Sequence, residues 1–391
     1  MGIVIASAVR TPMGAFQGAL SPLKASQLGA AAVREAVKRA RLDASAVELV
    51  LMGNVLPAGM GQAPARQAAI YAGLGQETPA VTLNKMCGSG LEAVIQASRA
   101  VSVGDVEVAV AGGMESMSNA PYLLPGARGG LRMGDKRLVD SMVYDGLWDV
   151  YTDQHMGSCA ELCASRYRFS RERQDAYAVR SYRRAQAAAA DGTFAAEIVT
   201  VEVPGKRGEV TSVARDEGPE RVEFAKVPAL KPAFQTEGTV TAANASTIND
   251  GAAALVITSE AVAKERGLSV LAHVRGYTSH ALAPEWFTVA PVEAMRKLFA
   301  RLDWAPDGVD VYEINEAFSV VPMAAIEEFG LDPDRVNVLG GAVALGHPIG
   351  ASGARILVTL LSALAKRGGG RGVASICIGG GEALAMAIET P

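Results

Sequence analysis

The sequence is poor in aromatic residues and in reactive side chains. Of its 391 residues, 5% are Phe, Trp or Tyr, and there are four cysteines and four histidines. The cysteines (Cys87, Cys159, Cys163 and Cys377) are scattered along a long chain, which is unlike a disulfide framework. A reducing compartment is therefore expected, in which each cysteine serves as core filler, metal ligand or nucleophile.

An excess of charge of one sign is also missing. The 37 basic and 41 acidic residues leave a net charge of −4, and no Lys/Arg cluster indicates nucleic-acid binding. No apolar run approaches the length that we expect for crossing a bilayer. The chain opens on an apolar stretch that resembles a buried strand, with no charged-then-apolar signal region before it. We therefore expect a cytoplasmic location.

Three common catalytic patterns are absent. No Gly-x-Gly-x-x-Gly opens a helix after the first strand, and neither a phosphate-binding P-loop nor a Gly-x-Ser-x-Gly motif occurs. A nucleotide enzyme or a serine hydrolase therefore has little support. The chain is instead 49% hydrophobic and rich in Ala and Gly, which at this length predicts a layered α/β protein of two or three packed units.

A short internal repeat indicates two similar halves. Cys87 and His347 each precede a Gly/Ser turn, a helical apolar pattern, a strand and a Gly-Gly-x-Glu sequence. The strands are expected at residues 106–110 and 373–378. Each half would then place one reactive residue at the turn that leads into a helix.

The middle of the chain differs in composition from the two halves. Its loops are rich in Gly, Pro and charge, and one long amphipathic helix is predicted over residues 171–190. We expect an N-terminal half over residues 1–118 and 249–271, a loop domain for substrate binding and oligomer contacts over 119–248, and a C-terminal half over 272–391.

Cys87 is the first candidate nucleophile. It follows a strand predicted over residues 80–83 and precedes Gly88-Ser89-Gly90 at the start of a helix. Free N–H groups at a helix N-terminus favour a thiolate, but by less than one pKa unit, so a thiol with a pKa of about 8.5 needs a further partner. The alternative is a buried structural cysteine.

His347 is a candidate for that partner. It lies among glycines and before Pro348, a setting that core packing does not explain well. A neutral imidazole can accept the proton of a thiol and so activate it. A histidine that is merely hydrogen-bonded within a loop is the alternative.

Two further positions could take part in the chemistry. Cys377 ends a strand before Gly379-Gly380-Gly381, whose N–H groups could face an oxyanion. Asn315 follows an apolar strand and could hold a water or a carbonyl group. Taken alone, a core-facing cysteine and a helix N-cap explain these residues better.

A zinc site is a weaker interpretation. His155, Cys159 and Cys163 recur every four residues and would share one face of a helix. Three such ligands could bind zinc. No fourth ligand with suitable spacing follows, and cysteines at these positions also suit a protein core.

Four motifs occur together in an order that resembles the thiolase family. They are Asn84-Lys85-Met86-Cys87-Gly88-Ser89-Gly90, Asn315-Glu316-Ala317-Phe318, the Gly-Gly-x-x-x-x-Gly-His-Pro-x-Gly sequence around His347, and Cys377-x-Gly-Gly-Gly. The match extends from Val9-Arg10-Thr11-Pro12 over nearly the whole chain. The resemblance implies two βαβαβαββ halves in five αβαβα layers, an inserted loop domain, and a dimer or, more often, a homotetramer.

The resemblance also implies the roles of the residues. In a short-chain biosynthetic thiolase, Cys87 becomes acylated, His347 activates it, and Cys377 removes the α-proton of a second acetyl-CoA. Asn315 holds a water that stabilises the enolate, and the N–H groups of Cys87 and Gly379 form an oxyanion hole. The reaction joins two acetyl-CoA molecules into acetoacetyl-CoA and CoA by a ping-pong route, with CoA as substrate and product and no required cofactor.

Further positions resemble the substrate-binding residues of the family. The sequence His155-Met156-Gly157 resembles the short-chain biosynthetic branch. Ser246 would lie near the pantetheine, and Arg221, Glu223 and Lys226 match positions at the nucleotide end of CoA. Ala317, Phe318 and Phe287 belong to the predicted substrate-binding set.

One stretch resembles a potassium-activated mitochondrial branch instead. Phe287 is followed by Val289-Ala290-Pro291, where many bacterial members have a different pocket wall. A potassium ion would then be surrounded, largely through carbonyl oxygens, by Tyr182, Ala242, Ala243, Ala245 and Val343. This branch accepts a 2-methyl group, so the acyl range stays open.

Three rival functions are compatible with parts of the pattern. A degradative 3-ketoacyl-CoA thiolase has the same chemistry with a deeper pocket, and His155 argues against it. A carrier-protein ketosynthase would have His or Asn where Cys377 stands. A non-catalytic lipid-binding relative would have lost catalytic residues, and none is missing here.

Overall fold

The computed structural model describes residues 2–391, apart from the side chain of Lys206. Its core is one ten-stranded mixed sheet with the order β14-β15-β16-β13-β1-β12-β5-β3-β4, to which β2 adds beside β12. The strands are β1 Ile3–Arg10, β2 Gly14–Ala15, β3 Leu49–Gly53, β4 Ala80–Leu83, β5 Val108–Ser116, β12 Asn249–Ser259, β13 Ala272–Ala281, β14 Val311–Ile314, β15 Arg371–Ile378 and β16 Glu382–Glu389.

The sheet consists of two halves with the same pattern. β4, β3 and β5 are parallel, β12 pairs antiparallel with β5, and β1 pairs antiparallel with β12. In the second half β14 and β15 are parallel, and β16 and β13 continue antiparallel. The two halves meet where β1 and β13 pair antiparallel, from Ile3 opposite Val274 to Ile5 opposite Ala272. This confirms the two similar halves expected from the repeat.

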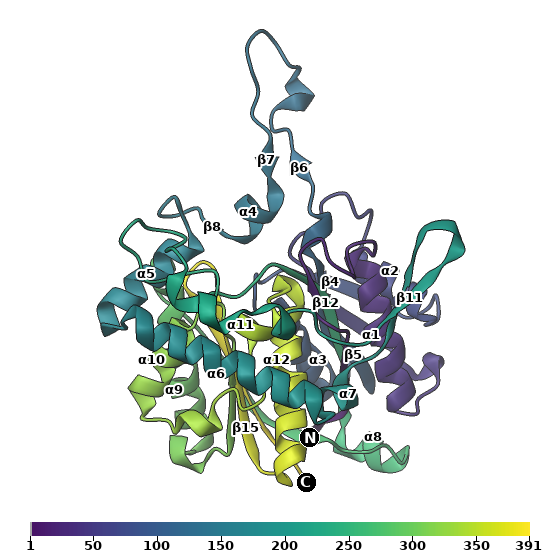
Figure 1. Cartoon of the computed structure of the whole chain (residues 1–391). Helices are drawn as coiled ribbons and strands as arrows, with labels where there is room; N and C mark the ends of the chain where they lie inside the picture. The colour runs from purple at the N-terminus through teal and green to yellow at the C-terminus, as the bar shows by residue number, and fades with distance from the viewer. Residues whose placement is uncertain (1) are drawn as a thin grey trace.

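Helices complete the five expected layers (Figure 1). α1 and α2 cover the outer face of the first half, and α9 and α10 cover that of the second. α3 and α12 lie between the halves, contact each other, and bury the central apolar cluster. The helices of the two halves are α1 Ala25–Arg39, α2 Pro64–Ala72, α3 Ser89–Val103, α8 Glu260–Glu265, α9 Ala290–Leu302, α10 Val320–Phe329, α11 Ala342–Leu345 and α12 Ile349–Arg367.

Glycines set the distance between the two central helices. A Cβ atom on Gly90 of α3 would lie 2.7 Å from the backbone N of Ala354, and one on Gly353 of α12 would lie 2.5 Å from the N of Leu91. Only glycine permits so close a backbone approach. The N-termini of α3 and α12 therefore lie side by side, and Cys87 and His347 precede them.

α12 corrects the expectation that no segment is long and apolar enough to cross a bilayer. Ile349–Arg367 passes that test by length and composition, with a mean hydropathy of 1.3. Within the most apolar 18-residue window of this helix, 83% of the residues are nevertheless buried inside the protein. Its apolar character is explained by its place between two sheets, since a central helix has no solvent-facing side.

The repeated Gly-Gly-x-Glu sequence does not occupy equivalent places. Gly112 to Glu115 lie inside β5, whereas Gly379 to Gly381 form the turn between β15 and β16. Glu115 is buried within the sheet, and Glu382 begins β16 at a partly exposed position. The order of reactive residue, turn, helix and strand is shared, but the final four residues are not.

The middle of the chain lies across the top of the sheet layers and over α12 (Figure 1). It includes the predicted long helix with the predicted bounds, α6 Arg171–Ala190. The hairpin of β6 and β7 projects away from the body. The elements of this region are β6 Tyr122–Leu123, β7 Val139–Asp140, α4 Ser141–Gly146, β8 Trp148–Asp149, β9 Gln154–His155, α5 Met156–Tyr167, α6, α7 Thr193–Glu197, β10 Val201–Pro204 and β11 Val210–Val213. The predicted division into 1–118 with 249–271, 119–248 and 272–391 stays a prediction.

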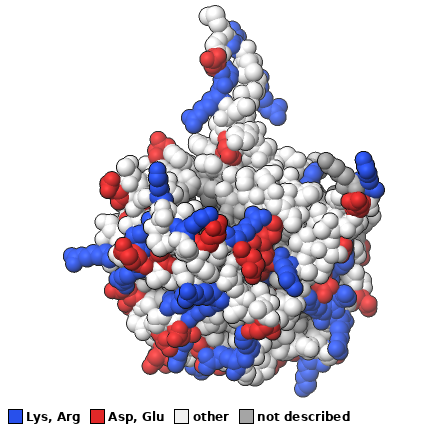
Figure 2. Space-filling model, in the orientation of Figure 1, with Lys and Arg blue, Asp and Glu red and all other residues white. Residues whose placement is uncertain are grey.

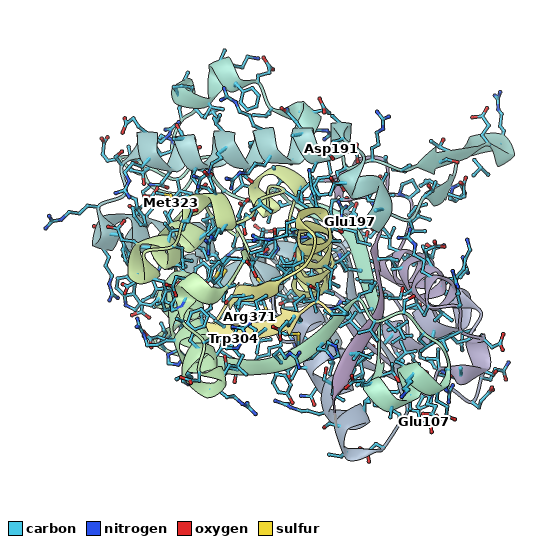
Figure 3. All side chains as sticks on the ribbon, turned by 90° about the horizontal axis from the view of Figure 1, so that it is seen from below. Glu107, Asp191, Glu197, Trp304, Met323 and Arg371 are labelled. Carbon is cyan, nitrogen blue, oxygen red and sulfur yellow. The ribbon has the colours of Figure 1, made fainter. Side chains whose placement is uncertain are left out.

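Charged side chains are mixed over the face seen in Figure 2, where Lys and Arg alternate with Asp and Glu. Seen from below, aromatic and basic side chains also meet at the surface, where Arg371 stacks over Trp304 at 4.7 Å from the ring centroid (Figure 3). Such mixing agrees with the small net charge of the chain.

Candidate active site

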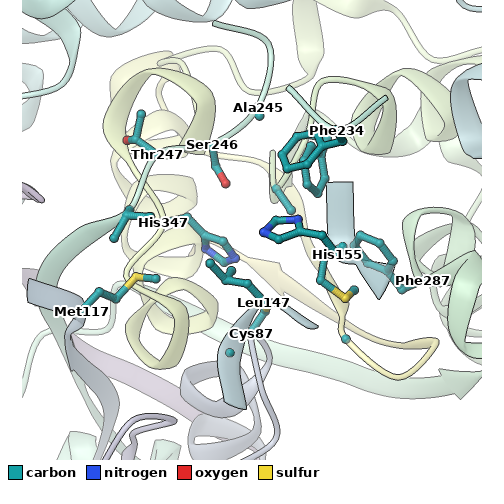
Figure 4. A pocket seen from close by; sticks show the side chains of 16 residues that line it. Cys87, Met117, Leu147, His155, Phe234, Ala245, Ser246, Thr247, Phe287 and His347 are labelled. Carbon is teal, nitrogen blue, oxygen red and sulfur yellow. The ribbon is translucent and has the colours of Figure 1, made fainter. Parts of the chain in front are cut away.

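A cavity of about 270 Å³ opens where the N-termini of α3 and α12 meet the middle region (Figure 4). Apolar side chains form most of its wall. Cys87, His347 and Gly379 reach it from three different segments. Its lining residues are Cys87, Met117, Gly146, Leu147, His155, Met156, Phe234, Ala245, Ser246, Thr247, Ile248, Phe287, Ala317, Phe318, His347 and Gly379.

The turn that carries Cys87 is held in a strained form. Met86 has φ +47°, a left-handed conformation that costs energy for a residue with a side chain. Two polar side chains fix this turn. Asn84 Oδ1 accepts from the N–H of Met86 at 3.0 Å, and Ser89 Oγ accepts from the N–H of Lys85 at 2.8 Å while donating to Met86 O at 2.6 Å.

The Cys87 thiol is neutral in this environment. Burial raises its pKa to about 11, and the negative charge of Glu115 acts in the same direction. The backbone N–H groups of Gly379 and of Cys87 itself oppose the rise, because they donate toward Sγ. These two donors come from opposite halves of the sheet. They would equally stabilise an oxyanion that forms next to Sγ.

His347 is oriented as a proton acceptor. Its Nδ1 lies 2.6 Å from Ser352 Oγ, and its Nε2 has no hydrogen-bond partner among the described residues. Its backbone N–H donates to Asn249 Oδ1 at 3.0 Å, which fixes the loop before α12. Burial, aided by the positive charge of Arg355, lowers the pKa of His347 to about 3. The ring is therefore neutral at neutral pH.

Asn315 and Cys377 lie behind the wall of the cavity. Both are fully buried, and neither is among the lining residues. Neither amide atom of Asn315 has a hydrogen-bond partner within residues 2–391. Burial raises the pKa of Cys377 well above its ordinary value, and the neighbouring Cys87 raises it further. A buried amide without partners is costly unless a water or substrate meets it.

His155 forms part of the opposite wall. Its ring stacks on Phe234 with centroids 4.7 Å apart, and its Nδ1 accepts from the N–H of Gly157 at 3.0 Å. Cys159 and Cys163 lie further along α5 and are buried in the apolar cluster of the second half. The three residues considered as zinc ligands therefore lie in different surroundings. All four cysteines are free thiols.

The other predicted substrate-binding residues fall into two groups. Met156, Ser246, Ala317, Phe318 and Phe287 line the cavity. Arg221 lines a second cavity of about 530 Å³ that shares Phe234 and residues 245–248 with the first. Glu223 and Lys226 are exposed and pair with each other at 2.7 Å.

Three of the five predicted potassium ligands line the second cavity. Tyr182, Ala242 and Ala245 line it. Ala243 and Val343 are buried outside its lining. The N–H of Val343 donates to Glu316 Oε2 at 3.0 Å.

Two buried carboxyl groups hold the loops of the site, and the sequence motifs indicated neither role. Glu115 accepts from the N–H groups of Val55, Leu56 and Gly350 at 2.8 to 3.1 Å and from Asn54 Nδ2. Burial raises its pKa to about 7.

Glu316 binds α6 to the loop that leads to His347. It accepts from the hydroxyl groups of Tyr177 and Ser181, from Asn337 Nδ2 and from the N–H of Val343. A glutamate inside an apolar, Gly-rich motif could have indicated both roles, because a buried carboxylate needs buried hydrogen-bond partners.

The chain matches the models of one protein family over almost its whole length. The family models described as "Thiolase, N-terminal domain" and "Thiolase, C-terminal domain" match residues 3–261 and 268–390. An acetyl-CoA acetyltransferase of Cupriavidus necator is 50% identical over 388 residues, covering 99% of each chain. Acetyl-CoA acetyltransferase 2 of Arabidopsis thaliana is 51% identical over 99% of this chain and 96% of its own length.

A solved structure extends the likeness to three dimensions. The crystal structure of a thiolase from Ascaris suum in complex with coenzyme A superposes with a TM-score of 0.95 at 47% identity. The match covers 100% of both chains.

Proposed function

Because the chain belongs to the thiolase family, we propose that it is an acetyl-CoA C-acetyltransferase. It catalyses the reversible Claisen condensation of two acetyl-CoA molecules to acetoacetyl-CoA and CoA. The observation that carries this proposal is the cavity in which the Cys87 thiol, the unpaired Nε2 of His347 and the Gly379 N–H meet. Relatives that carry this enzyme name are about 50% identical to the chain over almost its full length.

The first half-reaction transfers an acetyl group to Cys87. Sγ attacks the thioester carbonyl carbon of acetyl-CoA while Nε2 of His347 takes the thiol proton. The N–H groups of Cys87 and Gly379 stabilise the oxyanion of the tetrahedral intermediate. The bond from this carbon to the CoA sulfur then breaks. Because its pKa is raised, Cys377 holds a proton at this stage and gives it to the departing CoA thiolate.

The second half-reaction forms the carbon–carbon bond. The Cys377 thiolate removes an α-proton from a second acetyl-CoA. Asn315, through a water, and His347 stabilise the enolate oxygen, which gives the unpaired amide of Asn315 a partner. The α-carbon attacks the acetyl group on Cys87, the bond to Sγ breaks, and Cys87 recovers its proton from His347. Every proton that leaves a residue in the first half-reaction is restored in the second.

The second cavity supplies a route for the rest of CoA. It continues from the first through Ser246 and leads past Arg221, whose guanidinium suits a phosphate group. Glu223 and Lys226 would lie at the nucleotide end. The Ascaris suum relative was solved with coenzyme A bound.

Potassium activation is a finer proposal for the same enzyme. Tyr182, Ala242 and Ala245 meet at the second cavity, and Ala243 and Val343 would complete the ligands through carbonyl oxygens. If potassium binds there, exchanging sodium for potassium at constant ionic strength will raise kcat or lower KM for acetoacetyl-CoA. Equal rates in the two salts would contradict the site.

A homotetramer is proposed from two exposed apolar features. The projecting hairpin carries Leu131, Met133 and Leu138, which are each more than half exposed. β4 is an edge strand with Val81 exposed. Light scattering at micromolar concentration tests the assembly, and a monomer would contradict it. A cytoplasmic location stays a prediction, and one similar enzyme, from Gibberella zeae, is named as cytosolic.

The activity is tested by CoA-dependent cleavage of acetoacetyl-CoA beside 3-ketooctanoyl-CoA, with the wild type and Cys87→Ala. We expect the wild type to prefer the short substrate, because Phe287 and Phe318 pack edge to face across the cavity wall. The variant should cleave neither. A preference for the longer substrate would indicate a degradative 3-ketoacyl-CoA thiolase instead.

A further inference from the structure

The oxyanion site is assembled from two loops that belong to different halves of the molecule. Cys87 contributes its N–H from the turn before α3, and Gly379 contributes its N–H from the turn between β15 and β16. Their spacing depends on how the two halves are held at this point. Catalysis is sensitive to such spacing, because a displacement of about 1 Å can lower a rate ~100-fold.

Neither loop fixes its position relative to the other by its own sequence. Gly379-Gly380-Gly381 links Ile378 to Glu382, and Gly380 and Gly381 have φ of +90° and +83°. A three-glycine turn has little intrinsic conformational preference. In the opposite loop, Asn84 and Ser89 hold the strained turn at Met86 (φ +47°), but their hydrogen bonds do not reach the glycine turn. An external contact between the loops would therefore favour the catalytic arrangement.

Lys85 and Glu382 provide that contact. Lys85 directly precedes the strained Met86, Glu382 directly follows the three glycines, and their side chains form an ion pair through Nζ and Oε2. Among the ion pairs of the described residues, this one alone joins residues 1–118 or 249–271 directly to residues 272–391. The side chains are 27% and 37% exposed, so solvent screens the pair only in part.

The ion pair lies close to the reacting groups but contains none of them. Neither residue lines the substrate cavity, and Lys85 is not among the groups that shift the pKa of Cys87. Apolar packing between the loops supports the same geometry, since a Cβ on Gly88 would lie 2.4 Å from Ile378 Cδ1. The ion pair is thus placed to set loop position and not the charge on Sγ.

We propose that Lys85 and Glu382 are positioning residues that clamp the Cys87 turn to the Gly379–Gly381 turn and so hold the two oxyanion donors in register. The inference rests on the proposed function, because it assigns these N–H groups to the oxyanion. Partly exposed ion pairs contribute little to overall stability. The clamp should therefore be visible in kcat far more than in the melting temperature.

The test uses the full-length protein and acetoacetyl-CoA thiolysis. Lys85→Met and Glu382→Gln should each lower kcat about 10-fold and leave KM within about twofold. The Lys85→Met/Glu382→Gln double variant should be no slower than either single variant, because both changes break the same contact. The exchanged pair, Lys85→Glu with Glu382→Lys, should recover kcat to within about threefold of wild type.

The control is Lys366→Met. Lys366 pairs with Asp191 at 2.5 Å near the end of α12 that is remote from His347 (Figure 3 labels Asp191). This variant should keep wild-type kcat. If the single variants keep kcat within twofold of wild type, or if the exchanged pair is no faster than they are, the positioning role of Lys85 and Glu382 is contradicted. An inactive wild type would instead overturn the proposed function. If one single variant fails to fold, the exchanged pair alone decides.

Discussion

His347 Nδ1 and Ser352 Oγ lie 2.6 Å apart, and a third group determines which of them donates. Ser352 Oγ lies 2.9 Å from Pro348 O and uses its only proton there. The hydroxyl must therefore accept from Nδ1–H. The neutral imidazole, whose pKa burial lowers to about 3, then has its lone pair on Nε2, the atom without a partner at the cavity.

Ser352→Ala should weaken the catalytic base without disturbing substrate binding. Loss of the acceptor for Nδ1–H allows the other tautomer and a tilted ring, so kcat for thiolysis should fall about 10- to 100-fold with little change in KM. Ser98→Ala is the matched control, because Ser98 Oγ also donates to a carbonyl four residues earlier, in α3, and contacts no histidine. Equal effects of the two substitutions on kcat would contradict the role of Ser352.

The pH dependence of Cys87 alkylation tests the state of the free enzyme. With the pKa of Cys87 raised to about 11 and that of His347 lowered to about 3, the resting pair is a neutral thiol and a neutral imidazole. The rate of iodoacetamide reaction should then rise about tenfold per pH unit between about pH 7 and 9, following the small thiolate fraction. A rate that is constant above pH 7 would show a preformed thiolate–imidazolium pair.

The same shifts predict how stability depends on pH. The depressed pKa of His347 stabilises the folded state above the ordinary histidine pKa, and this contribution is lost as pH falls from about 6.5 to about 3. The raised pKa of Cys87 acts in the opposite sense, since its contribution is lost as pH rises from about 9 to about 11. The free energies of unfolding of wild type and His347→Asn, measured in urea, should therefore converge as the pH falls from about 6.5 toward 3.

Glu115→Gln should cost stability as well as activity. The carboxylate accepts from three backbone N–H groups and from Asn54, and an amide supplies one acceptor and places an NH₂ group against donors. We expect a loss of about 2–4 kcal/mol in the free energy of unfolding. Urea denaturation measures it, with Glu260→Gln at the exposed start of α8 as control. A loss below ~0.5 kcal/mol would contradict the role of Glu115.

Gly157→Ala should disturb the pocket wall through one methyl group. A Cβ at this position would lie 2.3 Å from the ring of Phe234, which stacks on His155. The ring has to move, so KM for acetoacetyl-CoA should rise several-fold, although alanine is the better helix former by about 1 kcal/mol. Gly129→Ala, which meets no atom within 4 Å, is the control. An unchanged KM in Gly157→Ala would show that the stack is dispensable.

The sequence predicted the parts of the fold that local patterns encode. The repeat around Cys87 and His347 predicted two halves, and apolar periodicity predicted α6 with its bounds. The Gly-Gly-x-Glu repeat misled in its last four residues, because the same letters form a strand interior in β5 and a turn before β16. Composition alone could not tell a buried central helix such as α12 from a membrane span.

The supporting residues of the site could not be predicted in the same way. Ser352 and Asn249 matter because each meets His347 in the folded chain, the latter over 98 residues of sequence. The Lys85–Glu382 contact joins positions 297 residues apart. Motifs identify residues that react, whereas these supporting contacts form only when distant parts of the chain come together in the fold.

The most direct test of the account is to mix the enzyme with acetoacetyl-CoA in the absence of free CoA, quench it with acid, and map the acyl group by peptide mass spectrometry. We expect one acetyl group on the peptide that contains Cys87, and none in the Cys87→Ala variant. An acetyl group on Cys377, or no covalent adduct while acetoacetyl-CoA is still cleaved, would contradict the assignment of Cys87 as the nucleophile.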